Sequence, residues 1–221
     1  MHVLAVEYPG YGLYKTSKPD EEKMKEDADT VYDYLTQVAG VKESDVILFG
    51  RSMGSGPCSY LASRKDCHSL LLMSPYMSIR DAAKSLLGWA SFLTVIVYER
   101  FRNIDLIAEA NCPVFFLHGQ KDTLIPHQHS IELNRVCPRE SYLHLPPEMD
   151  HNEFQLIEDL VAPFKQFIQQ LEAPQKRQPE EQQNQEESKT AVEKPSQGQG
   201  MQGESSSASA SASTTTKDET S

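Results

Sequence analysis

The chain has 221 residues and a formal net charge of −11 at pH 7. This length suits one domain with an appendage, and the acidic balance argues against a nucleic-acid-binding protein. From Pro174 onward the sequence contains no Leu, Ile, Phe, Tyr or Trp. Such a segment cannot bury enough apolar surface to offset the entropy lost on ordering. We therefore predict one domain over residues 1–172 and a disordered polar tail over residues 173–221.

The four cysteines show neither a metal-binding nor a disulfide pattern. Cys58, Cys67, Cys112 and Cys137 form no C-x-x-C pair, and none has a histidine at zinc-binding spacing. The sequence shows no secretory signal, so we expect reduced thiols in a cytosolic protein, with no metal and no cofactor. The longest apolar run, around LLGWASFLTVIVY, is shorter than the roughly 20 apolar residues that a bilayer span needs.

Apolar runs alternate with helical patterns along the domain. The runs predict five strands, at residues 2–12, 45–50, 68–75, 112–119 and 141–146. Helices are predicted at residues 20–40, 127–137 and 153–172, and from just after Ser52 through residue 65. Because the strands are almost continuously apolar and alternate with helices, the fold class is α/β, with a mostly parallel sheet covered by helices on both faces.

Two of these helices carry further detail. In the first, apolar residues recur at helical spacing and are expected to face the core: Met24, Ala28, Val31, Leu35 and Val38. Gly40 fits the C-terminal cap of that helix. In the last helix, Pro163 is expected to bend or break the helical path.

The segment Gly50-Arg51-Ser52-Met53-Gly54 follows one strand and precedes a helix. It matches the G-x-S-x-G nucleophile elbow, a tight turn that exposes a reactive serine hydroxyl above the sheet. Gly50 and Gly54 are expected where the turn leaves no room for a side chain. The backbone N–H of Met53 is the expected oxyanion donor. The alternative is a simple helix-capping turn.

A serine nucleophile needs a base, and the base needs an orienting acid. His151 follows the fifth predicted strand and is the expected base, the alternative being a surface histidine. Asp122 follows the fourth strand and is the expected acid, the alternative being a loop-capping carboxylate. Both positions fall at the carboxyl ends of strands, where ligands of parallel sheets bind. We read His118 and Gly119 as the strand-end turn that places Asp122.

Several other residues compete for these roles less well. His127 and His129 lie on the helix after the proposed acid, and His144 lies within a strand. His2 and His68 lie at strand starts, which is the wrong edge of the sheet. The carboxylates of Asp150 and Glu153 neighbour His151 in sequence, but immediate neighbours point apart.

Four stretches together carry a family resemblance: AVEYPGYG, DVILFGRSMGSGP, NIDLIAEANCPVFFLHGQKDTLIP and HNEF. Over roughly residues 3 to 171 the chain resembles the alpha/beta-hydrolase domain-containing 17 family. It is also similar to the domain-containing 13 group, through FGRSMG. The resemblance implies an alpha/beta-hydrolase fold and a protein-depalmitoylating thioesterase with Ser52, Asp122 and His151 as its triad.

The same resemblance implies partners and a location. The substrate would be an S-acylated protein or another acyl ester, and the protein would be cytoplasmic, with peripheral contact at the plasma membrane or endosomes. Members of the family carry further strands, a second oxyanion loop and an acylated cysteine cluster upstream. No residue here matches those features, so we expect an N-terminally truncated form whose fold lacks its first strands.

Residues 76–101 form an insertion that we expect to fold as a small cap. Its apolar residues Leu86, Leu87, Trp89 and Phe92 either line an acyl groove or pack on the sheet. Three functions therefore stay open at this point. The chain is an acyl-protein thioesterase, a small-ester esterase or serine peptidase of the same fold, or a non-catalytic module that binds a partner.

Overall fold

The computed structural model describes residues 2–15, 17–87 and 99–173, without the side chain of Leu86. These residues belong to one compact unit, Met1–Pro174. A second unit, Gln175–Ser221, lies outside the described residues, and so does almost all of the predicted polar tail.

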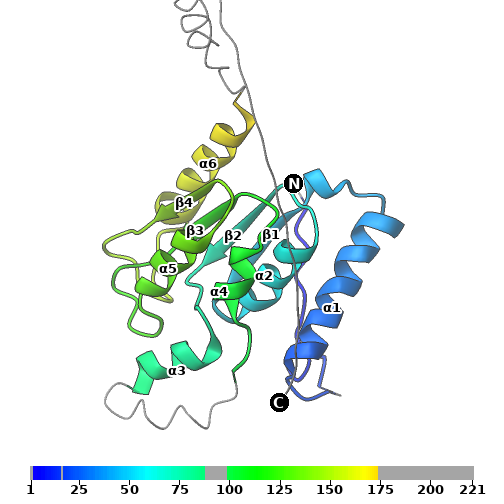
Figure 1. Cartoon of the computed structure of the whole chain (residues 1–221), viewed down its shortest axis with the longest axis horizontal. Helices are drawn as coiled ribbons and strands as arrows, with labels where there is room; N and C mark the ends of the chain where they lie inside the picture. Colours follow the sequence, from blue (N-terminus) through cyan, green and yellow to red (C-terminus); the bar gives the residue numbers. More distant parts are fainter. Residues whose placement is uncertain (1, 16, 88–98, 174–221) are drawn as a thin grey trace, which may run out of the picture. The chain divides into compact units, whose positions relative to one another are not determined.

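A four-stranded parallel sheet organises the described residues (Figure 1). Its strands follow one another in space in chain order: β1 (Ile47–Arg51), β2 (Ser69–Met73), β3 (Val114–Leu117) and β4 (Ser141–His144). Parallel strands need long crossover connections, and helices occur in each of them. The predicted parallel α/β sheet is confirmed, and four of the five predicted strands are present.

Six α-helices are described, together with several shorter helical turns. The α-helices are α1 (Glu21–Asp33), α2 (Ser55–Arg64), α3 (Ile79–Leu87), α4 (Asn103–Ala108), α5 (Gln128–Val136) and α6 (Ala162–Glu172). Turns of 3₁₀-helix cover Glu43–Asp45 and Ser52–Gly54, and π-helical turns cover Tyr34–Val38 and Leu156–Val161. Pro163 is the second residue of α6 and follows the π-helical turn over Leu156–Val161, so the regular α-helix begins beside the proline.

Side chains of β2 and β3 alternate between two apolar layers, as strand geometry requires. Leu72 and Phe116 contribute to the layer that also contains residues of α1, α2, α4 and α5. Leu71 and Phe115 contribute to the opposite layer, which contains Phe167 of α6. These two central strands are therefore buried on both faces.

Strand β1 departs from the predicted two-sided burial. Its residues alternate between exposed and buried, and the side chains of Ile47 and Phe49 are 39% and 51% exposed. Both belong to the face of the sheet that α6 covers at its centre. The predicted helices do cover both faces of the sheet, but the layer around Phe167 does not extend over β1.

The predicted buried strand at residues 2–12 is also wrong. No strand forms there, and Val3, Leu4 and Val6 are 82%, 59% and 41% exposed. An apolar run becomes a strand only where a neighbouring strand accepts and donates its backbone hydrogen bonds. Residues 2–7 have no such ladder in the structure.

The predicted core positions of the first helix are correct only in its first turns. Met24 and Ala28 are buried, but Val38 is 72% exposed and Tyr32 is buried in place of Val31. Tyr32 lies four residues after Ala28 in α1, so its burial keeps the α-helical spacing. The exposure of Val38 follows from the π-helical turn over Tyr34–Val38, whose longer repeat rotates its side chains away from an α-helical pattern. Gly40 then ends the helical path with φ of +70°, as predicted for a cap residue.

The predicted cap is described only in part. Its first portion is α3, and Leu87 at the end of that helix is 40% exposed. Trp89, Phe92 and the side chain of Leu86 lie outside the described residues. The acyl groove proposed for these four residues stays a prediction.

Candidate active site

Ser52 lies in a strained turn between β1 and α2. Its φ is +50°, in the left-handed region that non-glycine residues rarely adopt. A Cβ on Gly50 would lie 2.6 Å from the carbonyl oxygen of Gly54, and one on Gly54 would lie 3.0 Å from the hydroxyl of Tyr8. Gly50 thus lets the chain fold back on itself around the serine, and Gly54 leaves room for the side chain of Tyr8.

His151 brings an imidazole to this hydroxyl from the loop after β4. Its Nε2 is 3.1 Å from Ser52 Oγ, and its Nδ1 is 2.7 Å from Asp122 Oδ2. Because an ionised carboxylate only accepts hydrogen bonds, Nδ1 carries the proton and Nε2 is free to accept from the serine. The side chain of His151 is almost fully buried, which holds this geometry in place.

Asp122 is fixed by the loop that follows β3. Its Oδ1 accepts from the backbone N–H groups of Leu124 and Ile125, at 2.9 and 2.8 Å. Burial alone would raise the pKa of Asp122, but hydrogen bonds from His118, His151 and Ile125 outweigh it and hold the pKa well below its ordinary value of 3.8. The carboxylate therefore stays ionised at neutral pH.

His118 contributes a contact that the sequence does not reveal. This fully buried imidazole places Nε2 2.7 Å from the carbonyl oxygen of Ile125 and 3.3 Å from Asp122 Oδ2, while Nδ1 is 2.7 Å from Ser130 Oγ. Because a carbonyl only accepts, Nε2 carries a proton and points it towards the acid loop. A histidine four residues before the acid, at the end of a buried strand, was the only signal in the sequence.

Gly119 packs the acid loop against the base loop. A Cβ at this position would lie 2.1 Å from the carbonyl oxygen of Met149, two residues before His151. The backbone N–H of Lys121 also donates to that carbonyl, at 3.0 Å. The turn at His118 and Gly119 thus places both loops, and not Asp122 alone.

An apolar cluster adjoins the elbow. Met24, Tyr76, Phe101 and Ile125 are buried together, and Tyr8 and Met53 pack against them. Met53 follows the serine directly, and its carbonyl oxygen accepts from the hydroxyl of Tyr76 at 3.4 Å. The role of the Met53 N–H as an oxyanion donor stays a prediction.

The competing histidines have other partners. His129 accepts from the backbone N–H of Met77 at Nδ1, and its Nε2 lies 3.2 Å from Ser85 Oγ, so it connects α5 to α3. Burial lowers the pKa of His129 below 6.5. Asp150, the sequence neighbour of His151, accepts from the backbone N–H of His151. Of the three carboxylates weighed as the acid, Asp122, Asp150 and Glu153, only Asp122 is hydrogen-bonded to the ring of His151.

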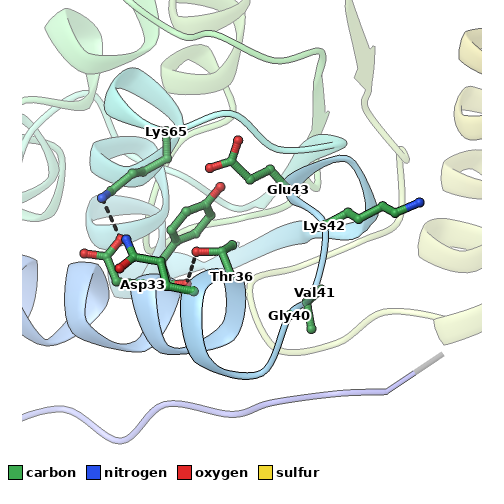
Figure 2. Close-up of a pocket in the computed structure, with 9 residues that line it drawn as sticks. Asp33, Thr36, Gly40, Val41, Lys42, Glu43 and Lys65 are labelled. Carbon is green, nitrogen blue, oxygen red and sulfur yellow. Dashed lines mark hydrogen bonds and ion pairs between the residues drawn. The ribbon is translucent and has the colours of Figure 1, made fainter.

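A separate hollow of about 430 Å³ lies between the end of α1, the loop before β1 and the end of α2 (Figure 2). Its lining is mostly polar and charged: Tyr32, Asp33, Thr36, Gln37, Gly40, Val41, Lys42, Glu43 and Lys65. Ser52, Asp122 and His151 do not line this hollow. Lys65, which does, is already paired with Asp33 at 2.8 Å. We therefore do not assign it to the chemistry of Ser52.

The described part of the chain shows neither a metal-binding cluster nor a membrane-spanning helix. Residues 2–15, 17–87 and 99–173 include no group of three or more His, Cys, Asp or Glu side chains arranged to hold a metal ion. Over the same residues, no helix combines the length and apolar character needed to cross a membrane.

The chain has clear relatives among known sequences, although no family model matches it. It is 30% identical over 167 residues to the alpha/beta hydrolase domain-containing protein 17C of Mus musculus, which covers 76% of this chain and 50% of the relative. The alpha/beta hydrolase domain-containing protein aho-3 of Caenorhabditis elegans is 29% identical over the same share of this chain. The chain is a homologue of the alpha/beta hydrolase domain-containing 17 proteins. It spans about half the length of the curated relatives it matches.

Comparison with solved structures bears on the fold of the chain. Acylaminoacyl peptidase of Pyrococcus horikoshii gives a TM-score of 0.54 at 14% identity, covering 68% of this chain and 27% of that one. Est1E of Butyrivibrio proteoclasticus gives 0.54 at 19% identity, covering 67% and 69%. Acetyl xylan esterase 1 of Thermoanaerobacterium sp. gives 0.53 at 15% identity, covering 66% and 52%. Identities this low bear on the fold alone, and they confirm the predicted alpha/beta-hydrolase fold.

Proposed function

We propose that this chain is a serine hydrolase that works through an acyl-enzyme. The observation that carries the proposal is the continuous hydrogen-bonded series from Ser52 Oγ through His151 to the buried carboxylate of Asp122. A nucleophile within hydrogen-bond reach of a base, with the base oriented by a third group, is the arrangement that activates a hydroxyl. A serine that only capped a helix would not require His151 and Asp122 to be arranged in this way.

In the first half-reaction, Ser52 Oγ attacks the acyl carbonyl carbon while His151 Nε2 takes the hydroxyl proton. The tetrahedral intermediate collapses, the bond to sulfur or oxygen breaks, and the imidazolium returns the proton to the leaving thiol or alcohol. In the second, water adds to the acyl-enzyme with His151 again as base, releasing a carboxylic acid and restoring Ser52. Asp122, ionised throughout, stabilises the imidazolium, and the Met53 N–H is the proposed donor to the oxyanion.

For the substrate we propose the palmitoyl thioester of a protein. Two arguments support this choice over a short-chain ester or a peptide amide. The sequence motifs resemble the domain-containing 17 family, which implies protein depalmitoylation. The apolar cluster that includes Tyr8, Met53 and Phe101 also adjoins the elbow, where an aliphatic acyl chain would be sheltered from water.

A fluorophosphonate probe, which reacts with activated serines, tests the reaction class. We expect the wild-type chain to become labelled and Ser52→Ala to stay unlabelled, with circular dichroism showing both to be folded. A folded wild type that takes up no probe would favour a non-catalytic module and contradict the proposal.

Substrate class is tested separately by comparing three compounds under the same conditions. These are an S-palmitoyl peptide, an acetyl ester and a peptide amide. We expect kcat/KM to be highest for the palmitoyl thioester. A preference for the acetyl ester would contradict the proposed palmitoyl thioester substrate and favour a small ester, while the proposed serine hydrolase chemistry would stand.

A further inference from the structure

Arg51 occupies the variable position between Gly50 and the nucleophile, and its side chain reaches the loop of the base. Its Nη2 lies 2.6 Å from the carbonyl oxygen of His151 and 2.8 Å from Oδ1 of Asn152. A guanidinium Nη carries two N–H groups, so this one nitrogen can donate to both acceptors. The two ends of the contact are about 100 residues apart in sequence.

The direction of the side chain follows from its place in β1. Residues 47, 49 and 51 alternate with the buried Leu48 and with Gly50, so Arg51 lies on the same face of the sheet as Ile47 and Phe49. That is the face that α6 covers, and the His151 loop leads into the helical segment ending in α6. Arg51 is therefore the residue of the elbow placed to meet that loop.

The backbone of His151 is held at both of its polar groups. Its N–H donates to the carboxylate of Asp150, and its carbonyl oxygen accepts from Arg51. The first of these bonds is local to the loop, whereas the second connects the loop to the residue next to the nucleophile. Only a long side chain with several fixed donors can make that connection and also reach Asn152.

We propose that Arg51 is a positioning residue that sets the distance between the Ser52 hydroxyl and the His151 ring by fixing the main chain of the base loop. The inference rests on the proposed serine hydrolase function. It predicts that loss of the guanidinium lets His151 shift relative to the nucleophile, and a displacement of about 1 Å can slow such chemistry by roughly 100-fold.

The first test measures activity in Arg51→Met and, as a matched control, Arg135→Met. Arg135 is another exposed arginine, paired with Glu132 on the surface of α5. We expect Arg51→Met to lower kcat and the rate of fluorophosphonate labelling by about 10- to 100-fold, with KM changed less than about threefold. Arg135→Met should match the wild type. An Arg51→Met rate within twofold of wild type overturns the proposal.

Chemical rescue separates positioning from a general structural defect. Arg51 is an exposed residue, so millimolar ethylguanidinium can enter the space that Arg51→Ala leaves open. We expect it to restore at least a tenth of the lost labelling rate in Arg51→Ala and to have no effect on the wild type. Slow labelling in a folded Arg51→Ala that no guanidinium compound improves counts against the proposal.

Hydrogen exchange tests the same contact without relying on activity. Amides of residues 149–155 should exchange at least tenfold faster in Arg51→Met than in the wild type, and at the wild-type rate in Arg135→Met. Unchanged exchange in this segment overturns the role of Arg51 whether or not the chain is active. If wild type takes up no probe while exchange rises in Arg51→Met, the proposed function fails and the contact between the elbow and the loop stands.

Discussion

Replacing Gly50 by alanine tests how tightly the elbow is closed. The new methyl carbon would lie 2.6 Å from the carbonyl oxygen of Gly54 and 2.9 Å from Ser55 Cα. Both are backbone atoms, so no side chain can rotate away. To reach an ordinary contact of 3.4 Å, the two segments must separate by about 0.8 Å.

That separation moves the nucleophile relative to its base. A displacement of about 1 Å can lower a rate roughly 100-fold, and forcing extra atoms into a packed site typically lowers the free energy of unfolding by about 1–3 kcal/mol. We therefore expect Gly50→Ala to label with fluorophosphonate about 100 times more slowly than wild type. Urea unfolding gives the accompanying change in stability.

Gly40→Ala is the matched control. Gly40 has a positive φ, of +70°, which Gly50 does not, but no atom lies within 4 Å of the added carbon. It lines the hollow shown in Figure 2, and none of the residues around Ser52 does. We expect a loss of about 1 kcal/mol in unfolding free energy from backbone strain, with unchanged labelling. Wild-type labelling in Gly50→Ala would refute the steric reasoning, and equal slowing in both variants would trace the effect to stability.

Three further predictions concern single side chains. In Asp122→Asn the amide would donate to His151 Nδ1 and move the ring proton to Nε2, so we expect kcat to fall about 10⁴-fold with little change in KM, measured by steady-state hydrolysis. Burial lowers the pKa of His129 below 6.5, so as the pH falls the histidine is protonated in the unfolded chain before it is protonated in the folded one. The contribution of neutral His129 to folding stability is therefore present above about pH 6.5 and is lost as the pH falls towards the lower pKa of the folded state. His129→Gln should therefore show a shallower decline in unfolding free energy between pH 7 and pH 5 than wild type in urea titrations. Phe167 is 2% exposed and packs 5.5 Å from the ring of Phe115, so Phe167→Ala should lose about 3–5 kcal/mol of unfolding free energy.

Each of these three predictions would be contradicted by a particular result. Wild-type kcat in Asp122→Asn would mean that the acid does not set the tautomer of the base. An unaltered pH slope in His129→Gln would assign the acid-sensitive stability to other groups. A loss below about 1 kcal/mol in Phe167→Ala would mean that α6 contributes little to the sheet.

Four of the five strands could be predicted from their apolar runs, although only β2 and β3 are buried on both faces. The runs that became β2 and β3 are continuously apolar because both of their faces are covered. Residues 2–7 carry a similar run, yet they form no strand. Strand formation depends on backbone partners supplied by other segments, and composition does not record them.

The candidate site shows the same division. Ser52, Asp122 and His151 could be named together because each follows a strand, and the carboxyl ends of parallel strands meet at one edge. The hydrogen bonds of Arg51 and His118 could not be predicted, because their partners lie in other loops. Motif spacing locates residues along the chain, whereas these hydrogen bonds depend on how separate loops meet.

The left-handed backbone at Ser52 bears on both halves of the proposed reaction. Its strain lies in the backbone torsion φ, whereas an acyl group would be attached through the side-chain oxygen Oγ. Attaching or releasing an acyl chain there changes no backbone torsion directly. The resting and acylated states can share one preorganised turn, so neither half-reaction has to rebuild the geometry that the other used.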